Sequence, residues 1–174
     1  MPSPIVDPVE HERRMAIWGR IEQLPGNPRD PDFHDMDRIL DEFYAPTITI
    51  EELLERYARG EKDFVDISLP HKADLTGINL AGANLKGAKL NRSNLTGANL
   101  QGADLSYAWM ASVNFTGANL EEANISWAYA ISTNFRNASL KNAIGSFNMR
   151  YGATYENTIM PKGYIIEDLY FGER

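Results

Sequence analysis

A five-residue repeat runs through the middle of this chain of 174 residues. It is clearest in the run ADLTG INLAG ANLKG AKLNR SNLTG ANLQG ADLSY, which begins at Ala73 and ends at Tyr107. Each unit carries a large apolar residue at its centre and a small residue, usually alanine, two positions earlier. A period of five matches neither an α-helix nor a β-strand. It indicates a repeat architecture, in which each unit buries its apolar side chains by stacking on its neighbours.

The residue types within a unit predict which way each side chain points. In an extended segment, side chains two positions apart point to the same side, so the small residue and the centre face inward together. The residue between them is usually Asn or Asp and should face water, and glycine often closes the unit where the chain must turn. The predicted interior repeat centres are Leu75, Leu80, Leu85, Leu90, Leu95, Leu100, Leu105, Met110, Phe115, Leu120, Ile125, Phe135 and Leu140. Each buried leucine contributes about 1.5–3 kcal/mol, which is enough for these columns to hold a fold together.

The motif A-(D/N)-L-x-x, repeated in phase over about half of the chain, resembles the pentapeptide-repeat family. The stretch LLERYARGEKDF, which leads into the repeats, resembles the cyanobacterial members of that family. The resemblance implies a mainly β fold, a right-handed quadrilateral β-helix with four units in each coil. With stacked coils about 4.8 Å apart, as strands are in a sheet, the repeats would make about five coils.

We expect three parts in the chain. Residues 1–60 form an N-terminal helical appendage and cap, residues 61–162 the β-helix, and residues 163–174 a C-terminal cap or tail. Apolar residues at helical spacing predict helices over residues 9–24, 33–44 and 51–59. The last of these should plug the open N-terminal end of the β-helix, because repeat proteins need atypical capping elements.

Two irregularities interrupt the repeat. The centres Leu69 and Leu75 are six residues apart, which predicts a bulge or bent corner between them. Further on, the expected centres become Gly145 and Arg150 before the pattern recovers at Tyr155 and Met160. An unpaired arginine buried among leucines would be very costly, so we expect the last coil to be distorted there. The apolar residues after 163 should cover the C-terminal end or a flank.

Composition and charge favour an interaction protein over an enzyme. The net charge is −7, and residues 1–72 account for it with 16 acidic and 9 basic side chains, whereas residues 73–160 carry 5 acidic and 6 basic ones. The chain lacks cysteine, so it has no thiolate metal ligands. His34, Asp35 and Asp37 are better interpreted as residues on a solvated helix face than as a metal site. We therefore predict neither catalytic residues nor a metal or cofactor site. Without an apolar signal-like or membrane-spanning stretch, a cytoplasmic location is expected.

Large aromatic residues depart from the repeat consensus in two columns. At twenty residues per coil, Tyr107, Trp127 and Phe147 would stack in one column, and Trp109, Tyr129 and Met149 in the next. At positions predicted to face water, these six residues would form an exposed apolar patch, and such patches mark interaction sites. The sequence leaves three coverings open: the chain's own terminal segments, a second copy in a homo-oligomer, or a foreign protein.

These features predict a non-enzymatic protein–protein interaction scaffold, a rigid prism that presents ladders of side chains to a protein partner, without direct nucleic-acid or membrane binding. The resemblance implies an alternative, because some pentapeptide-repeat proteins mimic B-form DNA and bind type II topoisomerases such as DNA gyrase. Mimicry requires a strongly negative rod, since the duplex carries one charge per about 1.7 Å. Here the repeats are nearly neutral, and Lys86, Lys89 and Arg92 cluster on them.

Overall fold

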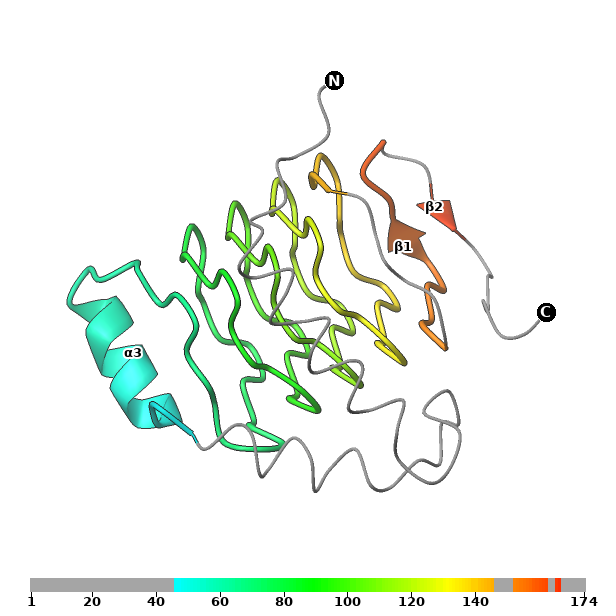
Figure 1. Ribbon diagram of the computed structural model, residues 1–174. Coiled ribbons are helices and arrows are strands. Elements are labelled where there is room, and N and C mark those ends of the chain that lie inside the picture. The colour runs from blue at the N-terminus through cyan, green and yellow to red at the C-terminus, as the bar shows by residue number, and fades with distance from the viewer. Residues whose placement is uncertain (1–45, 146–151, 163–164, 167–174) are drawn as a thin grey trace, which may run out of the picture. The chain divides into compact units, whose positions relative to one another are not determined.

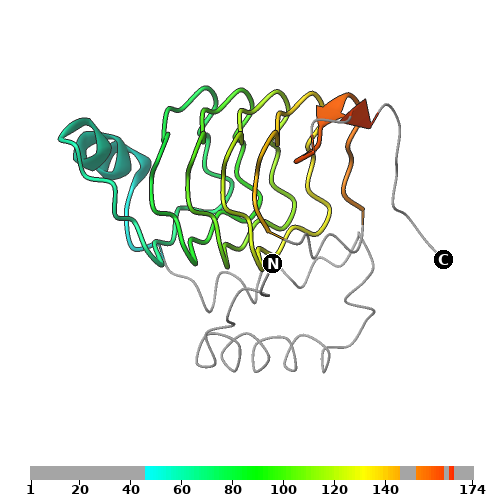
Figure 2. The ribbon, with the colours of Figure 1, turned by 90° about the horizontal axis from the view of Figure 1, so that it is seen from above.

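The computed structural model describes residues 46–145, 152–162 and 165–166. In this part the chain forms a β-helix, with helix α3 (Ile50–Ala58) at one end of the coils and strands β1 (Thr158–Ile159) and β2 (Ile165–Ile166) at the other (Figure 1). Seen from above, successive coils lie side by side along one axis (Figure 2). The helices predicted over residues 9–24 and 33–44 and the residues Phe147, Met149 and Arg150 lie outside the described residues.

Parallel backbone bridges join residues twenty positions apart, so four units complete each coil. The bridge between Asp74 and Asn94 continues to Asn114 and Asn134, and the other three sides of the prism repeat the arrangement. Hydrogen bonds flank each bridge: the Asn94 N–H donates to the Ala73 oxygen at 2.9 Å, and the Leu75 N–H donates to the Asn94 oxygen at 2.8 Å. The backbone thus satisfies its polar groups between coils, which lets the interior remain apolar.

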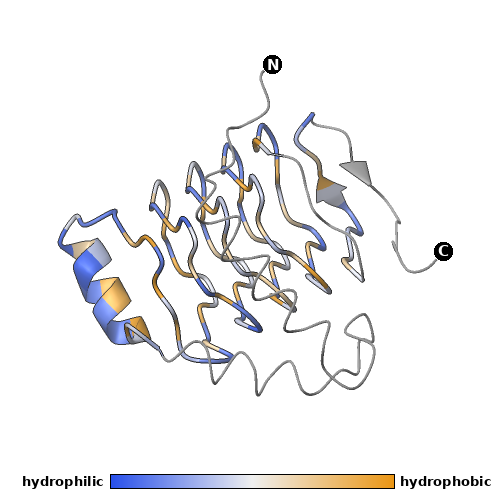
Figure 3. Cartoon of the chain, viewed as in Figure 1, coloured by the Kyte–Doolittle hydropathy of each residue, from blue (hydrophilic) through white to orange (hydrophobic). Residues whose placement is uncertain are grey.

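The interior of the prism holds the repeat centres. All thirteen centres named above are at most 2% exposed, and the alanines two positions before them are buried with them. One interior column changes from leucine to aromatic rings, with Phe115 and Phe135 stacked at 5.3 Å and Phe135 and Tyr155 at 5.6 Å. Along the coils, hydrophobic and hydrophilic residues alternate (Figure 3). The prism has a single packed core instead of two facing layers.

A tight turn follows each centre and sets the period of five. The N–H three positions after the centre donates to the centre's carbonyl oxygen, as from Ala98 to Leu95 at 3.0 Å. The second residue after the centre has a positive φ, +65° at Gly97 and +57° at Ser112. This conformation costs a residue with a Cβ about 1–2 kcal/mol, which explains why glycine recurs at this position.

Exchanging residues at two such turns should change stability in opposite directions. Ser112→Gly should raise the free energy of unfolding by about 1 kcal/mol, because glycine adopts the positive φ without strain. Gly117→Ala should lower it by about the same amount, since Gly117 has φ +67° and an added Cβ would meet nothing within 4 Å. Urea unfolding of both variants measures the difference. Equal midpoints would contradict the strain argument.

The asparagines between the small residue and the centre do more than face water. Their side-chain oxygens accept the backbone N–H two residues on, as from Thr96 to Asn94 at 3.2 Å. Their amide nitrogens donate to the preceding coil, as from Asn99 to Asn79 at 3.1 Å. Asp74 at the start of one ladder accepts from Thr76, and these hydrogen bonds hold the pKa of its carboxyl below its usual value. These hydrogen bonds explain why Asn and Asp are favoured over other polar residues at this position.

The six-residue spacing adds its extra residue at Pro70. Bridges before this point join residues 21 apart, Asp63 with Asn84 and Ser68 with Lys89, and bridges after it join residues 20 apart. The turn shifts by one position, so that the Ala73 N–H donates to the Pro70 oxygen at 3.1 Å. The corner between Leu69 and Leu75 is thus enlarged while the interior register is kept.

Helix α3 packs against the first coil. Its start is capped by Thr49, whose hydroxyl oxygen accepts the Glu52 N–H at 3.1 Å. Its end has the two hydrogen bonds of a Schellman motif, from the Gly60 N–H to the Tyr57 oxygen and from the Glu61 N–H to the Arg56 oxygen. The helix was expected over residues 51–59 and lies over residues 50–58, because Thr49 is its N-cap.

Side chains of α3 tie the helix to the coils. Leu53 is fully buried in the core, and the Tyr57 hydroxyl donates to the Ala81 oxygen at 2.8 Å. The Arg56 guanidinium lies 5.4 Å from the centre of the Phe64 ring and forms an ion pair with Glu61. The hydrogen bond from Arg56 lowers the pKa of the Glu61 carboxyl. These contacts close the apolar end of the β-helix.

At the C-terminal end, β1 and β2 form an antiparallel pair, with Thr158 opposite Ile166 and Ile159 opposite Ile165. Ile159 also bridges Ser139 of the preceding coil. Tyr155 and Met160 are buried, at 2% and 9% exposure, whereas Gly145 is exposed and does not act as an interior centre. A second strand therefore covers part of the edge that the last coil would otherwise leave unpaired.

Candidate protein-binding site

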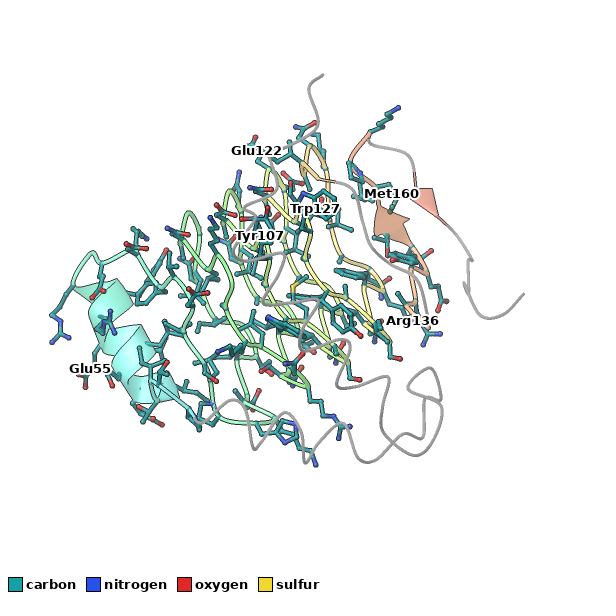
Figure 4. All side chains as sticks on the ribbon, in the orientation of Figure 1. Glu55, Tyr107, Glu122, Trp127, Arg136 and Met160 are labelled. Carbon is teal, nitrogen blue, oxygen red and sulfur yellow. The ribbon has the colours of Figure 1, made fainter. Side chains whose placement is uncertain are left out.

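The aromatic residues gather on one side of the prism. We call this side the aromatic face; its backbone bridges join Ser68, Lys89, Trp109 and Tyr129 in succession. Tyr107 and Trp127 occupy the adjoining corner on neighbouring coils (Figure 4). The two columns predicted from the twenty-residue period are thus adjacent over the four members that lie in the described residues.

The corner residues have an unfavourable backbone conformation. Tyr107 has φ +61° and Trp127 has φ +60°, at the turn position that glycine occupies in many other units. A bulky residue in this region is uncommon, and each costs about 1–2 kcal/mol relative to glycine. Nine other non-glycine residues of the described ranges also have a positive φ, so Tyr107 and Trp127 differ from them in carrying large aromatic rings. Sequence reasoning missed this feature, although the glycines at 77, 82, 87, 97 and 102 were a signal for it.

The expectation that this patch is exposed is wrong for its first members. Tyr107 is 7% exposed and Trp109 is 6% exposed, while Trp127 and Tyr129 are half-buried. Part of the reason is that the rings cover one another, since those of Trp109 and Tyr129 pack with centroids 5.5 Å apart. Lys86 lies over the Tyr107 ring at 5.5 Å, and burial raises the pKa of the Tyr129 hydroxyl above its ordinary value. The chain itself therefore covers much of this surface.

The aromatic face is also basic. Lys72, Lys89 and Arg92 lie on it or at its border, and residues 67–72, 88–93, 108–113 and 128–133, which form the face, include no carboxylate. Asp66 is the acidic residue at the adjoining corner. The period of twenty alone predicts that Lys89 precedes Trp109 and Tyr129 in one column, so this combination of charge and rings could have been recognised from sequence.

Other kinds of site have less support. Within the described ranges, no group of three or more His, Asp or Glu side chains is placed to hold a metal ion. None of the helices in those ranges is long and apolar enough to cross a membrane.

Comparison with known proteins agrees with this architecture. The family model described as pentapeptide repeats matches eight copies over residues 73–108 and 110–144. No curated protein matches the chain. Among solved structures, the chain is similar to alr5209, a pentapeptide repeat protein from Nostoc PCC 7120, with 31% identity and a TM-score of 0.56 over 63% of this chain and 97% of that one.

Two further structures are similar at lower TM-scores. One is a pentapeptide repeat protein from the thylakoid lumen of Arabidopsis thaliana, 31% identical over 56% of this chain and 60% of that one, with a TM-score of 0.36. The other is Rfr23 from the cyanobacterium Cyanothece 51142, 21% identical over 52% of this chain and 77% of that one, with a TM-score of 0.31. The repeat, the coils of twenty residues and the match to alr5209 lead to one conclusion: this chain belongs to the pentapeptide-repeat family, whose fold is the right-handed β-helix.

Proposed function

We propose that the protein is a non-enzymatic scaffold that holds a protein partner on its aromatic face. The observation that carries the proposal is the pair of strained corner residues, Tyr107 and Trp127, where glycine would make a more stable turn. Tyrosine and tryptophan dominate the binding energy of many protein interfaces. A rigid prism of about five coils, with strand spacing of about 4.8 Å, would hold them in fixed register. The proposed contact residues are Tyr107, Trp109, Trp127, Tyr129, Phe147 and Met149.

The charge of the face narrows the class of partner. With Lys72, Lys89 and Arg92 beside the rings, an acidic segment with one apolar side is the complementary ligand. An amphipathic helix fits, because it would place its apolar side on the rings and its carboxylates against the cations. The same charges count against DNA mimicry, which needs a uniformly negative surface.

Other parts of the proposal concern the organisation of the whole protein. We place the boundaries of the β-helix at residues 61 and 162, with a helical appendage and cap before it and a cap or tail after it. A cytoplasmic location and the possibility of a homo-oligomer belong to the same proposal. None of these features is needed for the aromatic face to bind a partner.

Affinity capture with three full-length baits tests the proposal. Tyr107→Gly/Trp127→Gly removes both rings and gives the corners the residue that other units use there. It should reduce retention of the partner at least about tenfold, because each hot-spot ring contributes about 2 kcal/mol or more. Glu122→Gly is the matched control, since Glu122 has φ +60° at a different corner. Quantitative mass spectrometry compares the baits, and a partner retained equally by all three would contradict the proposed site.

A further inference from the structure

The asparagine ladders on the outside of the prism have a direction. In the described coils, the side-chain amides that take part in a ladder donate to the coil before them. Asn84 donates to Asp63 at 2.9 Å, and Asn119 donates to Asn99 at 3.3 Å. A ladder that began with asparagine would therefore end, at the N-terminal coil, in an amide whose donors point away from the prism.

Two ladders begin with aspartate instead. Asp63 accepts from Asn84, and Asp74 accepts from the Thr76 hydroxyl at 2.6 Å and from the Asn94 amide at 3.4 Å. Both aspartates are exposed. An ionised carboxylate accepts hydrogen bonds and donates none. These two ladders thus end on a negative charge, with no amide donor that seeks a further partner.

The backbone beside the two aspartates is open. In the next coil, the Asn94 N–H donates to the Ala73 oxygen and the Asn94 oxygen accepts the Leu75 N–H. The equivalent N–H and C=O groups of Asp63 and Asp74 have no hydrogen-bond partner among the residues that the structure describes. We call these groups, with the two carboxylates, the N-terminal edge. A row of unpaired backbone groups is a template for another strand.

The other two sides of the first coil are occupied by the chain itself. On one, the Thr47 N–H donates to the Ser68 oxygen at 2.9 Å and the Thr47 hydroxyl accepts the Ser68 N–H at 2.9 Å. On the other, the Tyr57 hydroxyl donates to the Ala81 oxygen at 2.8 Å, and the ladder begins with Asn79. Neutral residues therefore begin the two sides that Thr47 and Tyr57 contact, and aspartates begin the two sides with open backbone.

A second copy of this chain is the ligand that matches the N-terminal edge. Its coils have the same bridge spacing and the same ladder direction, and its C-terminal coil ends these two sides with Ile144 and Thr154. Ile144 is 59% exposed. Stacking the copies head to tail in register would place Asp63 on Ile144 and Asp74 on Thr154. A carboxylate held between two coils would lose its hydration, which costs several kcal/mol unless a cation replaces the water.

We infer that the N-terminal edge is an assembly surface for a second copy and that the carboxylates of Asp63 and Asp74 keep it closed. A head-to-tail contact of this kind does not close on itself, so stacking would continue into filaments. Charged residues at an open edge are a known means of preventing such pairing. The inference goes beyond the proposed function, because it concerns the end of the prism and holds whether or not the aromatic face binds a partner.

The full-length variant Asp63→Asn/Asp74→Asn tests the inference, since asparagine keeps the size of each side chain, removes its charge and adds amide donors. Its mass by light scattering should rise with concentration to at least about twice that of the wild type under the same conditions. Exchange of the backbone amide protons at positions 63 and 74 should slow at least about tenfold in the assembled protein. Asp104→Asn is the matched control, because Asp104 lies within a ladder, between Asn84 and Asn124.

A second double variant, Asp63→Lys/Asp74→Lys, restores a charge of opposite sign at the same positions and should remain unassembled. Equal mass of the asparagine variant and the wild type at every concentration would overturn the inference. So would assembly without slower exchange at positions 63 and 74, because another surface would then be in contact. Equal assembly of the Asp104 control or of the lysine variant would contradict the role of the two charges. A lowered melting temperature with faster exchange throughout the coils would contradict it as well, since aggregation would then follow unfolding.

Discussion

Replacing Leu100 by aspartate is expected to prevent folding of the β-helix. Leu100 is fully buried in the column between Leu80 and Leu120, where its surroundings are apolar. Burying an unpaired carboxylate in such a site costs several kcal/mol, and so does protonating it to avoid the charge. A domain of this size is stable by only about 5–15 kcal/mol, so one such substitution removes much of its stability.

The measurement is the soluble yield and the thermal melting curve of Leu100→Asp beside Gln101→Asp. Gln101 is the next residue in the chain and is exposed, so the control adds the same charge on the outer surface. The control should melt within a few degrees of the wild type. A Leu100→Asp protein that is soluble and melts like the control would place Leu100 outside the core.

Phe135→Ala is expected to lower the free energy of unfolding by about 3–5 kcal/mol. The Phe135 ring is 1% exposed and lies between Phe115 and Tyr155, with centroids 5.3 Å and 5.6 Å away. Truncation would leave a cavity between two coils that the backbone bridges hold at a fixed spacing, so the site has little freedom to collapse. The loss should therefore include a cavity term as well as the lost burial.

Urea unfolding of Phe135→Ala and Phe135→Leu separates these contributions. Leucine fills most of the site and already occupies the equivalent position at Leu75 and Leu95, so that variant should lose less than about 2 kcal/mol. A loss below about 1 kcal/mol for Phe135→Ala would show that the ring column does not support the C-terminal coils.

The repeat made most of the fold predictable from the sequence. Because the residue types recur with a period of five, the interior position of Leu85 or Leu105 follows from the pattern alone. The same period locates the irregular corner between Leu69 and Leu75. The period does not predict the hydrogen bonds of the asparagine side chains. From its polarity alone, Asn94 would be expected only to face water.

The aromatic face could be predicted in part. Its composition follows from the spacing of twenty residues, which places Lys89, Trp109 and Tyr129 in one column. Its burial does not, because burial of Tyr107 depends on how side chains from sequence-distant parts of the chain meet. The strained backbone at Tyr107 and Trp127 could have been predicted only by recognising that the glycine position of the repeat is a turn with positive φ.

Photo-crosslinking on the aromatic face tests most directly whether this face binds protein. Ile131 follows Tyr129 on the face and is half-buried, whereas Gln101 is exposed on another side of the prism. A benzophenone amino acid at position 131 of the full-length protein should crosslink to a foreign protein in cells. The same probe at position 101 should not give this product. Equal crosslinking from both positions, or none from position 131, would contradict the account.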